Sequence, residues 1–104
     1  MKQQDYFAAF EKENQEELEL TKRKNSDYAD DANAFANFEI IHHLSCGRIT
    51  PEQGFVVRMS DKMQRIANLI ARENQVPDEK ITDTLRDLSV YSKLLRIYLM
   101  NKGK

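Results

Sequence analysis

The sequence predicts an all-α protein, a four-helix bundle formed by one domain that covers residues 1–104. Only three glycines and two prolines interrupt the chain, so long stretches of it favour helix. Apolar residues recur at steps of three and four, which is the period of a helix with one buried side. Near the middle, Thr50 can cap a helix, Pro51 suits its first position, and Gln53 completes a capping-box pattern.

The first two predicted helices cover residues 3–23 and 31–45. Their apolar positions are Phe7, Phe10 and Leu18, followed by Phe35, Phe38, Ile41 and Leu44. Gly47 is expected to end the second helix, because glycine accepts the left-handed conformation that commonly follows a helix. The polar segment 24–31, KNSDYADD, is predicted to be a turn, since Asn and Asp side chains compete for backbone hydrogen bonds.

The last two predicted helices cover residues 51–74 and 78–101, and Pro77 marks the break between them. In the third helix the apolar stripe consists of Val56, Met59, Met63, Ile66 and Ile70. In the fourth helix the main stripe consists of Ile81, Leu85, Leu88, Ser92, Leu95 and Leu99. Core packing is the expected role of both stripes.

Composition narrows the classes of protein. The 16 basic and 17 acidic side chains nearly cancel, so stable DNA binding is not expected. Cys46 is the only cysteine, which excludes an intrachain disulfide and a cysteine metal cluster and suits a reducing compartment. No apolar run approaches the roughly 20 residues of a membrane span, and the first residues lack a signal-peptide core. We therefore expect a cytoplasmic protein with no membrane partner.

Two aspartates, Asp83 and Asp87, share one side of the fourth helix, roughly 80–100° from the nearer edge of its main stripe. Two carboxylates this close repel, so the pair requires a cation, an arginine or a metal ion nearby. The same row continues as Val90, Leu94 and Ile97, which predicts packing against another helix or a second subunit. The structural alternative is that the helix dipole favours Asp83 near the helix start, although Asp87 lies too far in for that effect.

A basic row lies on the third helix, roughly opposite its apolar stripe, and consists of Arg58, Lys62 and Arg65. Such a row can hold phosphate oxygens, because guanidinium donors match them in a bidentate fork. Asp61, three residues from Arg58 and four from Arg65, would orient either arginine. The alternative is an ordinary solvated face.

The remaining polar residues give weaker signals. One expected loop contains Lys24, Asn25, Asp27 and Tyr28. It could bind a nucleotide base and its phosphates, or it could be an ordinary polar loop. Two adjacent histidines follow later in the chain. Those two, His42 and His43, diverge by roughly 100° on a helix and cannot chelate one ion from the same face. We interpret them as surface or helix-end histidines.

Three motifs taken in order resemble the nucleotide modification associated domain family, which is small, helical and common in bacteriophages and bacteria. They are K-N-x-D-Y from Lys24, R-M-x-D-K-x-x-R-I from Arg58, and D-T-L-x-D-L-x-x-Y-S from Asp83. The likeness covers residues 24–95. It implies a role near nucleotides or modified DNA bases.

A looser likeness exists to the all-α NTP pyrophosphohydrolases of the MazG and dimeric dUTPase type. Those enzymes bind Mg²⁺ through an E-x-x-E pair and an E-x-x-D pair on two helices. Here Glu13 and Glu16, or Glu16 and Glu19, have the first spacing. Asp83 and Asp87 replace the second pair at a spacing of four, which departs from the pattern.

Three functions remain open from the sequence. The first, which we favour, is capture of a nucleotide or nucleotide-derived signalling molecule, such as a host defence messenger in a phage-infected cytoplasm. The second is a Mg²⁺-dependent NTP pyrophosphohydrolase, with Asp83, Asp87 and a first-helix glutamate on the metal and the basic row on the phosphates. The third is a helical interaction module. A homo-oligomer is also expected, because Tyr91 and Tyr98 accompany the second apolar row.

Overall fold

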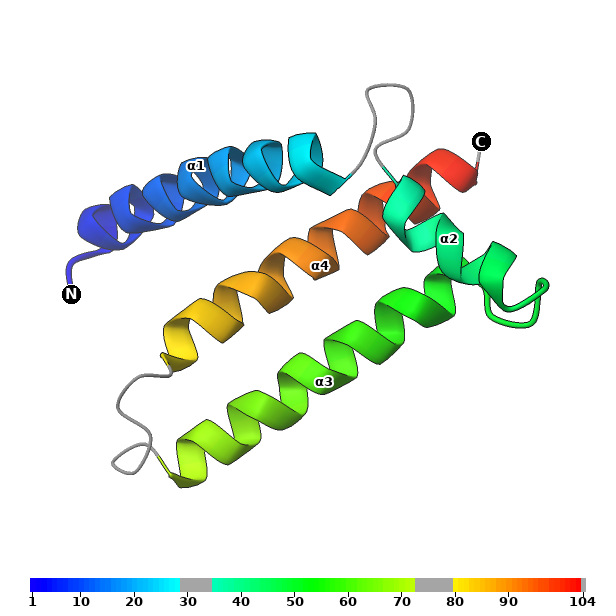
Figure 1. Ribbon diagram of the computed structural model, residues 1–104. Coiled ribbons are helices and arrows are strands. Elements are labelled where there is room, and N and C mark those ends of the chain that lie inside the picture. The colour runs from blue at the N-terminus through cyan, green and yellow to red at the C-terminus, as the bar shows by residue number, and fades with distance from the viewer. Residues whose placement is uncertain (29–34, 73–79, 104) are drawn as a thin grey trace. The chain divides into compact units, whose positions relative to one another are not determined.

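The computed structural model describes residues 1–28, 35–72 and 80–103, with the backbone alone for residues 25–28. Four helices form within these ranges and no strand does, so the all-α prediction is confirmed (Figure 1). Their bounds are α1, Gln3–Tyr28; α2, Ala36–Leu44; α3, Pro51–Ala71; and α4, Ile81–Lys102. No helix of the described residues is both long and apolar enough to cross a membrane.

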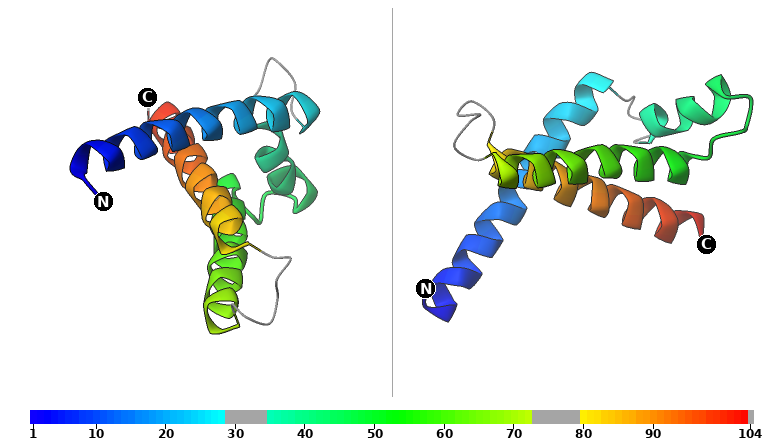
Figure 2. Two further views of the ribbon diagram at one scale, coloured as in Figure 1. Left: turned by 90° about the vertical axis from the view of Figure 1, so that its left-hand side faces the viewer. Right: turned by 90° about the horizontal axis from the view of Figure 1, so that it is seen from below.

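The chain divides into two compact units, Met1–Ala36 and Asn37–Lys104. The first unit consists mainly of α1, and the second contains α3, α4 and nearly all of α2. The packing of all four helices into one bundle, and with it the single domain, therefore stays a prediction. Within the second unit, α3 and α4 lie side by side and run antiparallel (Figures 1 and 2).

The first unit carries an aromatic group near its start, where the ring of Tyr6 lies 5.7 Å from that of Phe7 and 6.2 Å from that of Phe10. Charged residues fill its later turns, and Lys12 and Glu16 form an exposed ion pair at 4.0 Å. The predicted end of this helix, at residue 23, was wrong, because α1 continues to Tyr28. Asn, Ser and Asp each disfavour a helix interior by less than about 0.7 kcal/mol, so a preceding run of strong helix formers can continue through them.

The connection from α2 to α3 follows the predicted signals. Gly47 adopts φ 81°, and its N–H donates to the His42 carbonyl at 2.8 Å, which ends α2 as expected. Thr50 Oγ1 accepts from the Gln53 N–H at 3.1 Å, while Gln53 Oε1 accepts from the Thr50 N–H at 2.9 Å. The capping box at the start of α3 is therefore confirmed.

Aromatic rings from three helices form the centre of the second unit. Phe55 of α3 is fully buried, and its ring stacks on Phe38 of α2 with centroids 4.0 Å apart. Tyr91 of α4 meets Phe38 edge-on at 6.2 Å, and Tyr98 lies 6.0 Å from Phe55. These contacts hold α2 against the α3/α4 pair.

The expected core role of the predicted apolar stripes of α3 and α4 was wrong for several of their residues, which are exposed. Val56, Met63 and Ile70 of α3 are 54–61% exposed, and Leu85 and Leu99 of α4 are 46% and 47% exposed. Ile66 of the predicted α3 stripe is buried as expected, whereas the other buried apolar side chains of this helix, Pro51, Phe55 and Leu69, lie outside the stripe. At 100° per residue, each predicted stripe lies about 90° round the helix from the side that meets the other helix.

In an antiparallel pair, stripes displaced in the same sense on both helices arrive on the same side of the pair. The α3/α4 pair therefore presents one apolar face, which we define by Val56, Met59, Met63, Ile70, Leu85, Leu88, Leu95 and Leu99. Within it, Met59, Leu88 and Leu95 are half-buried and the others are exposed. The boundary between α3 and α4 therefore combines a few buried apolar residues, such as Ile66 and Leu69, with aromatic and charged side chains.

Candidate functional site

Three polar contacts join α3 to α4. Near one end of the pair, Lys102 Nζ lies 2.5 Å from Glu52 Oε2. Further along, Arg58 Nη1 donates to the Tyr91 hydroxyl at 3.4 Å. Lys62 and Asp87 form the next contact, and residue numbers rise on α3 as they fall on α4, as antiparallel register requires. The boundary between the helices thus carries charges that a purely apolar seam would not.

The acid pair predicted from the sequence is met by positive charge at one of its two members. Lys62 Nζ lies 3.3 Å from Asp87 Oδ2, and the two side chains are 20% and 29% exposed. Asp83, one turn earlier on α4, is exposed and forms no ion pair within the described residues. Asp87 thus contacts another helix, where Lys62 offsets its charge, whereas packing of the whole row that continues to Ile97, which is 53% exposed, stays a prediction.

The basic row is only partly free to bind a ligand. The Arg58 guanidinium lies 5.6 Å from the centroid of the Phe38 ring and also contacts Tyr91, so protein groups fix its position. Arg65 is exposed and forms no ion pair within the described residues. The register that sets Lys62 opposite Asp87 sets Arg65 on the same turn as Asp83. Four charged residues therefore occupy two adjacent turns of the pair, and we call Lys62, Arg65, Asp83 and Asp87 the charged quartet.

Asp61 does not orient the arginines of the basic row. It is exposed, and within the described residues it forms no ion pair with Arg58 or Arg65. The groups that position Arg58 are Tyr91 and Phe38, which belong to other helices. Helical spacing brought Asp61 within reach of both arginines, but partners across the helix boundary determined where Arg58 lies.

The predicted polar loop does not form over residues 24–28. Lys24, Asn25, Asp27 and Tyr28 belong to the last turns of α1. Lys24 is exposed, whereas the side chains of the other three lie outside the described residues. They are part of the first unit, so their association with the charged quartet stays a prediction.

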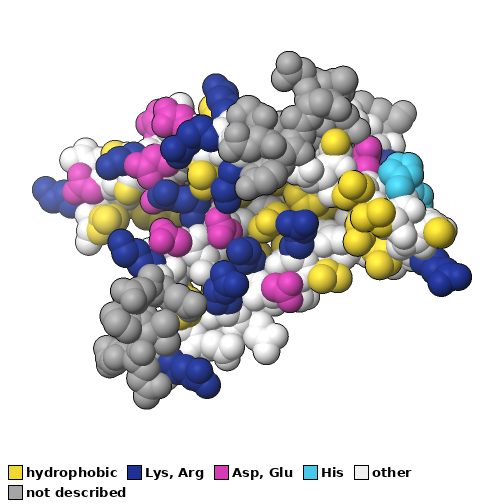
Figure 3. Space-filling model, in the orientation of Figure 1, with side chains coloured by type: hydrophobic (Ala, Val, Ile, Leu, Met, Phe, Trp, Pro, Cys, Tyr) yellow, Lys and Arg dark blue, Asp and Glu magenta, His cyan; other side chains and the backbone are white. Residues whose placement is uncertain are grey.

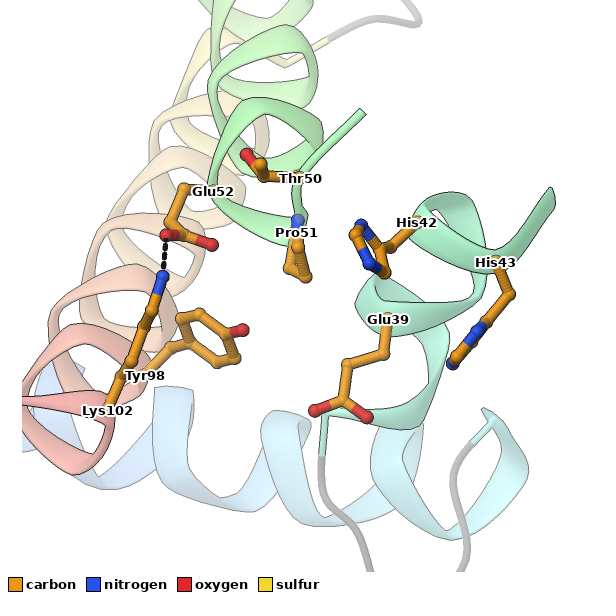
Figure 4. Close-up of a pocket in the computed structure, with 8 residues that line it drawn as sticks. All are labelled: Glu39, His42, His43, Thr50, Pro51, Glu52, Tyr98 and Lys102. Atoms are coloured by element: carbon orange, nitrogen blue, oxygen red, sulfur yellow. Dashed lines mark hydrogen bonds and ion pairs between the residues drawn. The ribbon is translucent and has the colours of Figure 1, made fainter. Parts of the chain in front are cut away.

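A cavity of about 340 Å³ lies where α2, α3 and α4 meet, and none of the predicted site residues lines it (Figure 4). Its lining residues are Glu39, His42, His43, Thr50, Pro51, Glu52, Tyr98 and Lys102. His42 Nδ1 lies 3.2 Å from the Ile49 carbonyl oxygen. Gly54 permits the approach of α2, since a Cβ there would lie 3.2 Å from Ile41 Cγ2. We call this space the three-helix cavity.

Three pKa shifts describe the electrostatics of this cavity. The hydrogen bond from Lys102 lowers the pKa of Glu52, and the same bond raises the pKa of Lys102. Burial raises the pKa of Tyr98, and the charges of Glu52 and Glu39 raise it further. The charge of Lys102 opposes the two carboxylates, which together outweigh it at the phenol.

The side chains divide unevenly over the surface. On the face drawn in Figure 3, hydrophobic side chains gather over α2 and the nearby end of the α3/α4 pair, whereas basic and acidic side chains lie along the pair.

Among the described residues, no three His, Cys, Asp or Glu side chains are placed to hold a metal ion together. Asp83 and Asp87 supply two carboxylates, which is as many as Mg²⁺ sites often use beside phosphate and water.

Neither the models of protein families, nor curated proteins, nor solved structures give a match to this chain. The resemblance to the nucleotide modification associated domain family, carried by the motifs at Lys24, Arg58 and Asp83, therefore stays a prediction, as does the looser likeness to the NTP pyrophosphohydrolases.

Proposed function

We propose that the protein binds a nucleotide or a nucleotide-derived signalling molecule at the charged quartet and holds it without converting it. The observation that carries the proposal is the Lys62–Asp87 contact of 3.3 Å, since it places a fixed cation and a fixed carboxylate next to the exposed Arg65 and Asp83. The motifs that contain these residues are the same ones that resemble the nucleotide-associated family.

Phosphate binding follows from the chemistry of the two cations. The Arg65 guanidinium is exposed and offers a planar pair of N–H donors that fits two phosphate oxygens. Lys62 is a point charge with three donors, so it can bind a phosphate oxygen while it keeps its contact with Asp87. Asp83 would repel a bare phosphate, and it could with Asp87 hold a Mg²⁺ ion, which would supply positive charge for the phosphates there.

Incubation with a mixture of nucleotides, with and without Mg²⁺, followed by denaturation and analysis of what the protein retained, tests this function. Intact ligand recovered from the protein is the expected result. A nucleoside monophosphate together with pyrophosphate would instead establish the pyrophosphohydrolase, with Mg²⁺ on Asp83 and Asp87. If the protein neither retains nor converts any nucleotide, the helical interaction module would be the remaining function.

Arg65→Ala provides the residue-level test, because Arg65 is exposed and its loss disturbs no ion pair of the described residues. We expect nucleotide affinity measured by calorimetry to fall about tenfold, which corresponds to about 1.4 kcal/mol for one lost charge-assisted contact. Arg96→Ala is the matched control, since Arg96 contacts Met100 on a different side of α4. Equal affinities of the two variants would remove the basic row from the proposal.

The apolar face of the α3/α4 pair favours association of identical chains. Exposed apolar patches of this kind commonly mark protein interfaces. We therefore propose a homo-oligomer that buries this face. Met63→Lys should shift the sedimentation coefficient to that of a smaller species, whereas Gln64→Lys, which adds the same charge on another side of α3, should not. A wild-type protein that sediments as a monomer at all concentrations would contradict this.

The setting we propose comes from the family resemblance: a phage-encoded protein that acts in the host cytoplasm and sequesters a nucleotide signal of host defence. A stable complex with DNA is not part of the proposal, because the 16 basic and 17 acidic side chains nearly cancel. A retention assay with nucleotides from phage-infected cells would test the setting directly. Recovery of DNA fragments in place of a small nucleotide would contradict it.

A further inference from the structure

We propose that the three-helix cavity is a second binding site, and that it takes a small organic cation with N–H donors, an amine or an amidine. The cavity measures about 340 Å³, which suits a small molecule. It lies wholly within the second unit and shares no residue with the charged quartet. Binding there is therefore independent of nucleotide binding.

The charge of the lining residues favours a cation. Glu39 of α2 and Glu52 of α3 supply two carboxylates, and Lys102 supplies one ammonium group. Glu39 and His42 face Glu52 and Tyr98 across the space (Figure 4). Burial raises the pKa of Tyr98 most; Glu52 and Glu39 raise it further and Lys102 lowers it, so the two carboxylates together outweigh the ammonium group at the phenol. An anionic ligand would meet this excess of negative charge unfavourably.

One carboxylate oxygen lacks a donor. Glu52 Oε2 accepts from Lys102 Nζ, whereas Glu52 Oε1 is buried and has no hydrogen-bond partner among the described residues. A buried acceptor without a donor is destabilising, and a ligand N–H that reached it after a small rotation of the side chain would satisfy it. The Lys102 side chain is 59% exposed, so it can move aside toward solvent.

The other lining groups fit a flat cation. Tyr98 presents an aromatic ring, which attracts a cation placed over its face. The neutral tautomer of His42 that donates its Nδ1–H to the Ile49 carbonyl leaves Nε2 as an acceptor. An amidinium group offers planar N–H donors to such acceptors while its delocalised charge lies against the ring.

Benzamidine is the probe for this site, and benzamide and benzoate are its neutral and anionic counterparts of similar shape. Titrations of the full chain followed by ¹H–¹⁵N NMR should give saturable shifts at lining residues for benzamidine. We expect its Kd to be at least tenfold lower than that of benzamide, and we expect benzoate not to bind. Equal affinity for benzamide, tighter binding of benzoate, or no saturable binding of benzamidine would overturn the proposal.

Glu39→Gln is the decisive variant, since it removes one charge and keeps the size of the side chain. The Kd for benzamidine should rise at least fivefold, with unchanged helicity by circular dichroism. Glu11→Gln, an exposed change on α1, and Arg65→Ala, in the charged quartet, should leave that Kd within twofold. An unchanged Kd for Glu39→Gln would overturn the electrostatic basis of the site. A loss of benzamidine binding in Arg65→Ala would overturn its independence from the charged quartet.

Discussion

Lys62 and Asp87 join α3 to α4 through an Nζ to Oδ2 distance of 3.3 Å, and neither side chain is more than 29% exposed. Partial burial weakens screening by water, so such a pair contributes more than a fully exposed one. It also makes the two aspartates of α4 unequal, because Asp87 is held between helices and Asp83 is exposed. Their repulsion is offset where the helices meet, which explains how two adjacent carboxylates are tolerated.

Asp87→Asn should lower the free energy of unfolding by about 1 kcal/mol, because it leaves the half-buried Lys62 ammonium without its counter-charge. Urea unfolding measures the change through its midpoint. Asp83→Asn is the matched control and should change stability by less than about 0.5 kcal/mol, since Asp83 is exposed. Equal midpoints for the two variants would mean that the Lys62–Asp87 contact contributes nothing.

Phe55→Ala should be the most destabilising of the substitutions discussed, at about 3–5 kcal/mol, because Phe55 is fully buried and contacts rings from α2 and α4. Val57→Ala, two residues on and 59% exposed, is its control and should cost less than about 1 kcal/mol. Thermal unfolding followed by circular dichroism separates the two. A small effect of Phe55→Ala would mean that the aromatic contacts of Phe55 contribute little to the stability of the second unit.

The sequence predicted the four helices of the described residues and the start of α3, because those depend on local chemistry. Thr50 and Gln53 cap the helix through neighbouring backbone groups, and Gly47 needs only its own φ. Burial depends instead on partners from other helices. The apolar stripe through Met63 was expected in the core, yet Phe55 and Lys62 occupy the side that meets α4, where an aromatic ring and a lysine stem pack equally well.

The two candidate sites also differ in how far local sequence patterns predict them. Spacing along one helix is enough to predict a row of residues, and Asp87 and Lys62 each belong to such a row. The three-helix cavity joins Glu39, Glu52 and Tyr98, which come from three helices and share no local pattern. His42 lies in the last turn of α2, as expected of a helix-end residue, but its position beside residues of α3 depends on the packing of two helices. No spacing rule within one helix could have found that cavity.

The Glu52–Lys102 pair should make stability depend on pH in acid. The hydrogen bond from Lys102 lowers the pKa of Glu52, so the folded state holds this proton less tightly than the unfolded state does. The pair therefore stabilises the fold above pH 4.5, the ordinary value for the group, and the contribution is lost as pH falls through the lowered pKa. Glu52→Gln should lower the melting temperature at pH 7 and make its fall toward pH 3 shallower.

Glu11→Gln serves as the control for this pH dependence, because Glu11 is exposed on α1. It should leave both the melting temperature at pH 7 and the acid slope close to those of the unsubstituted protein. At alkaline pH the dependence of stability on pH has the opposite sign. The pKa of Lys102 is raised in the folded state, so its contribution to stability is lost as pH rises above 10.5. Identical acid slopes for Glu52→Gln and Glu11→Gln would contradict the role of the pair.

Tyr98 should report the negative potential of the three-helix cavity directly. Burial raises its pKa, and Glu52 and Glu39 raise it further because their charges oppose formation of the phenolate. Glu39→Gln removes one of those charges, so the pKa of Tyr98 should fall toward the ordinary value of 10.0. Ultraviolet titration measures it as the difference between each protein and the same protein carrying Tyr98→Phe. A difference curve that does not move with Glu39→Gln would show that Glu39 does not act on the phenol, and the case for a cation in this cavity would lose its electrostatic support.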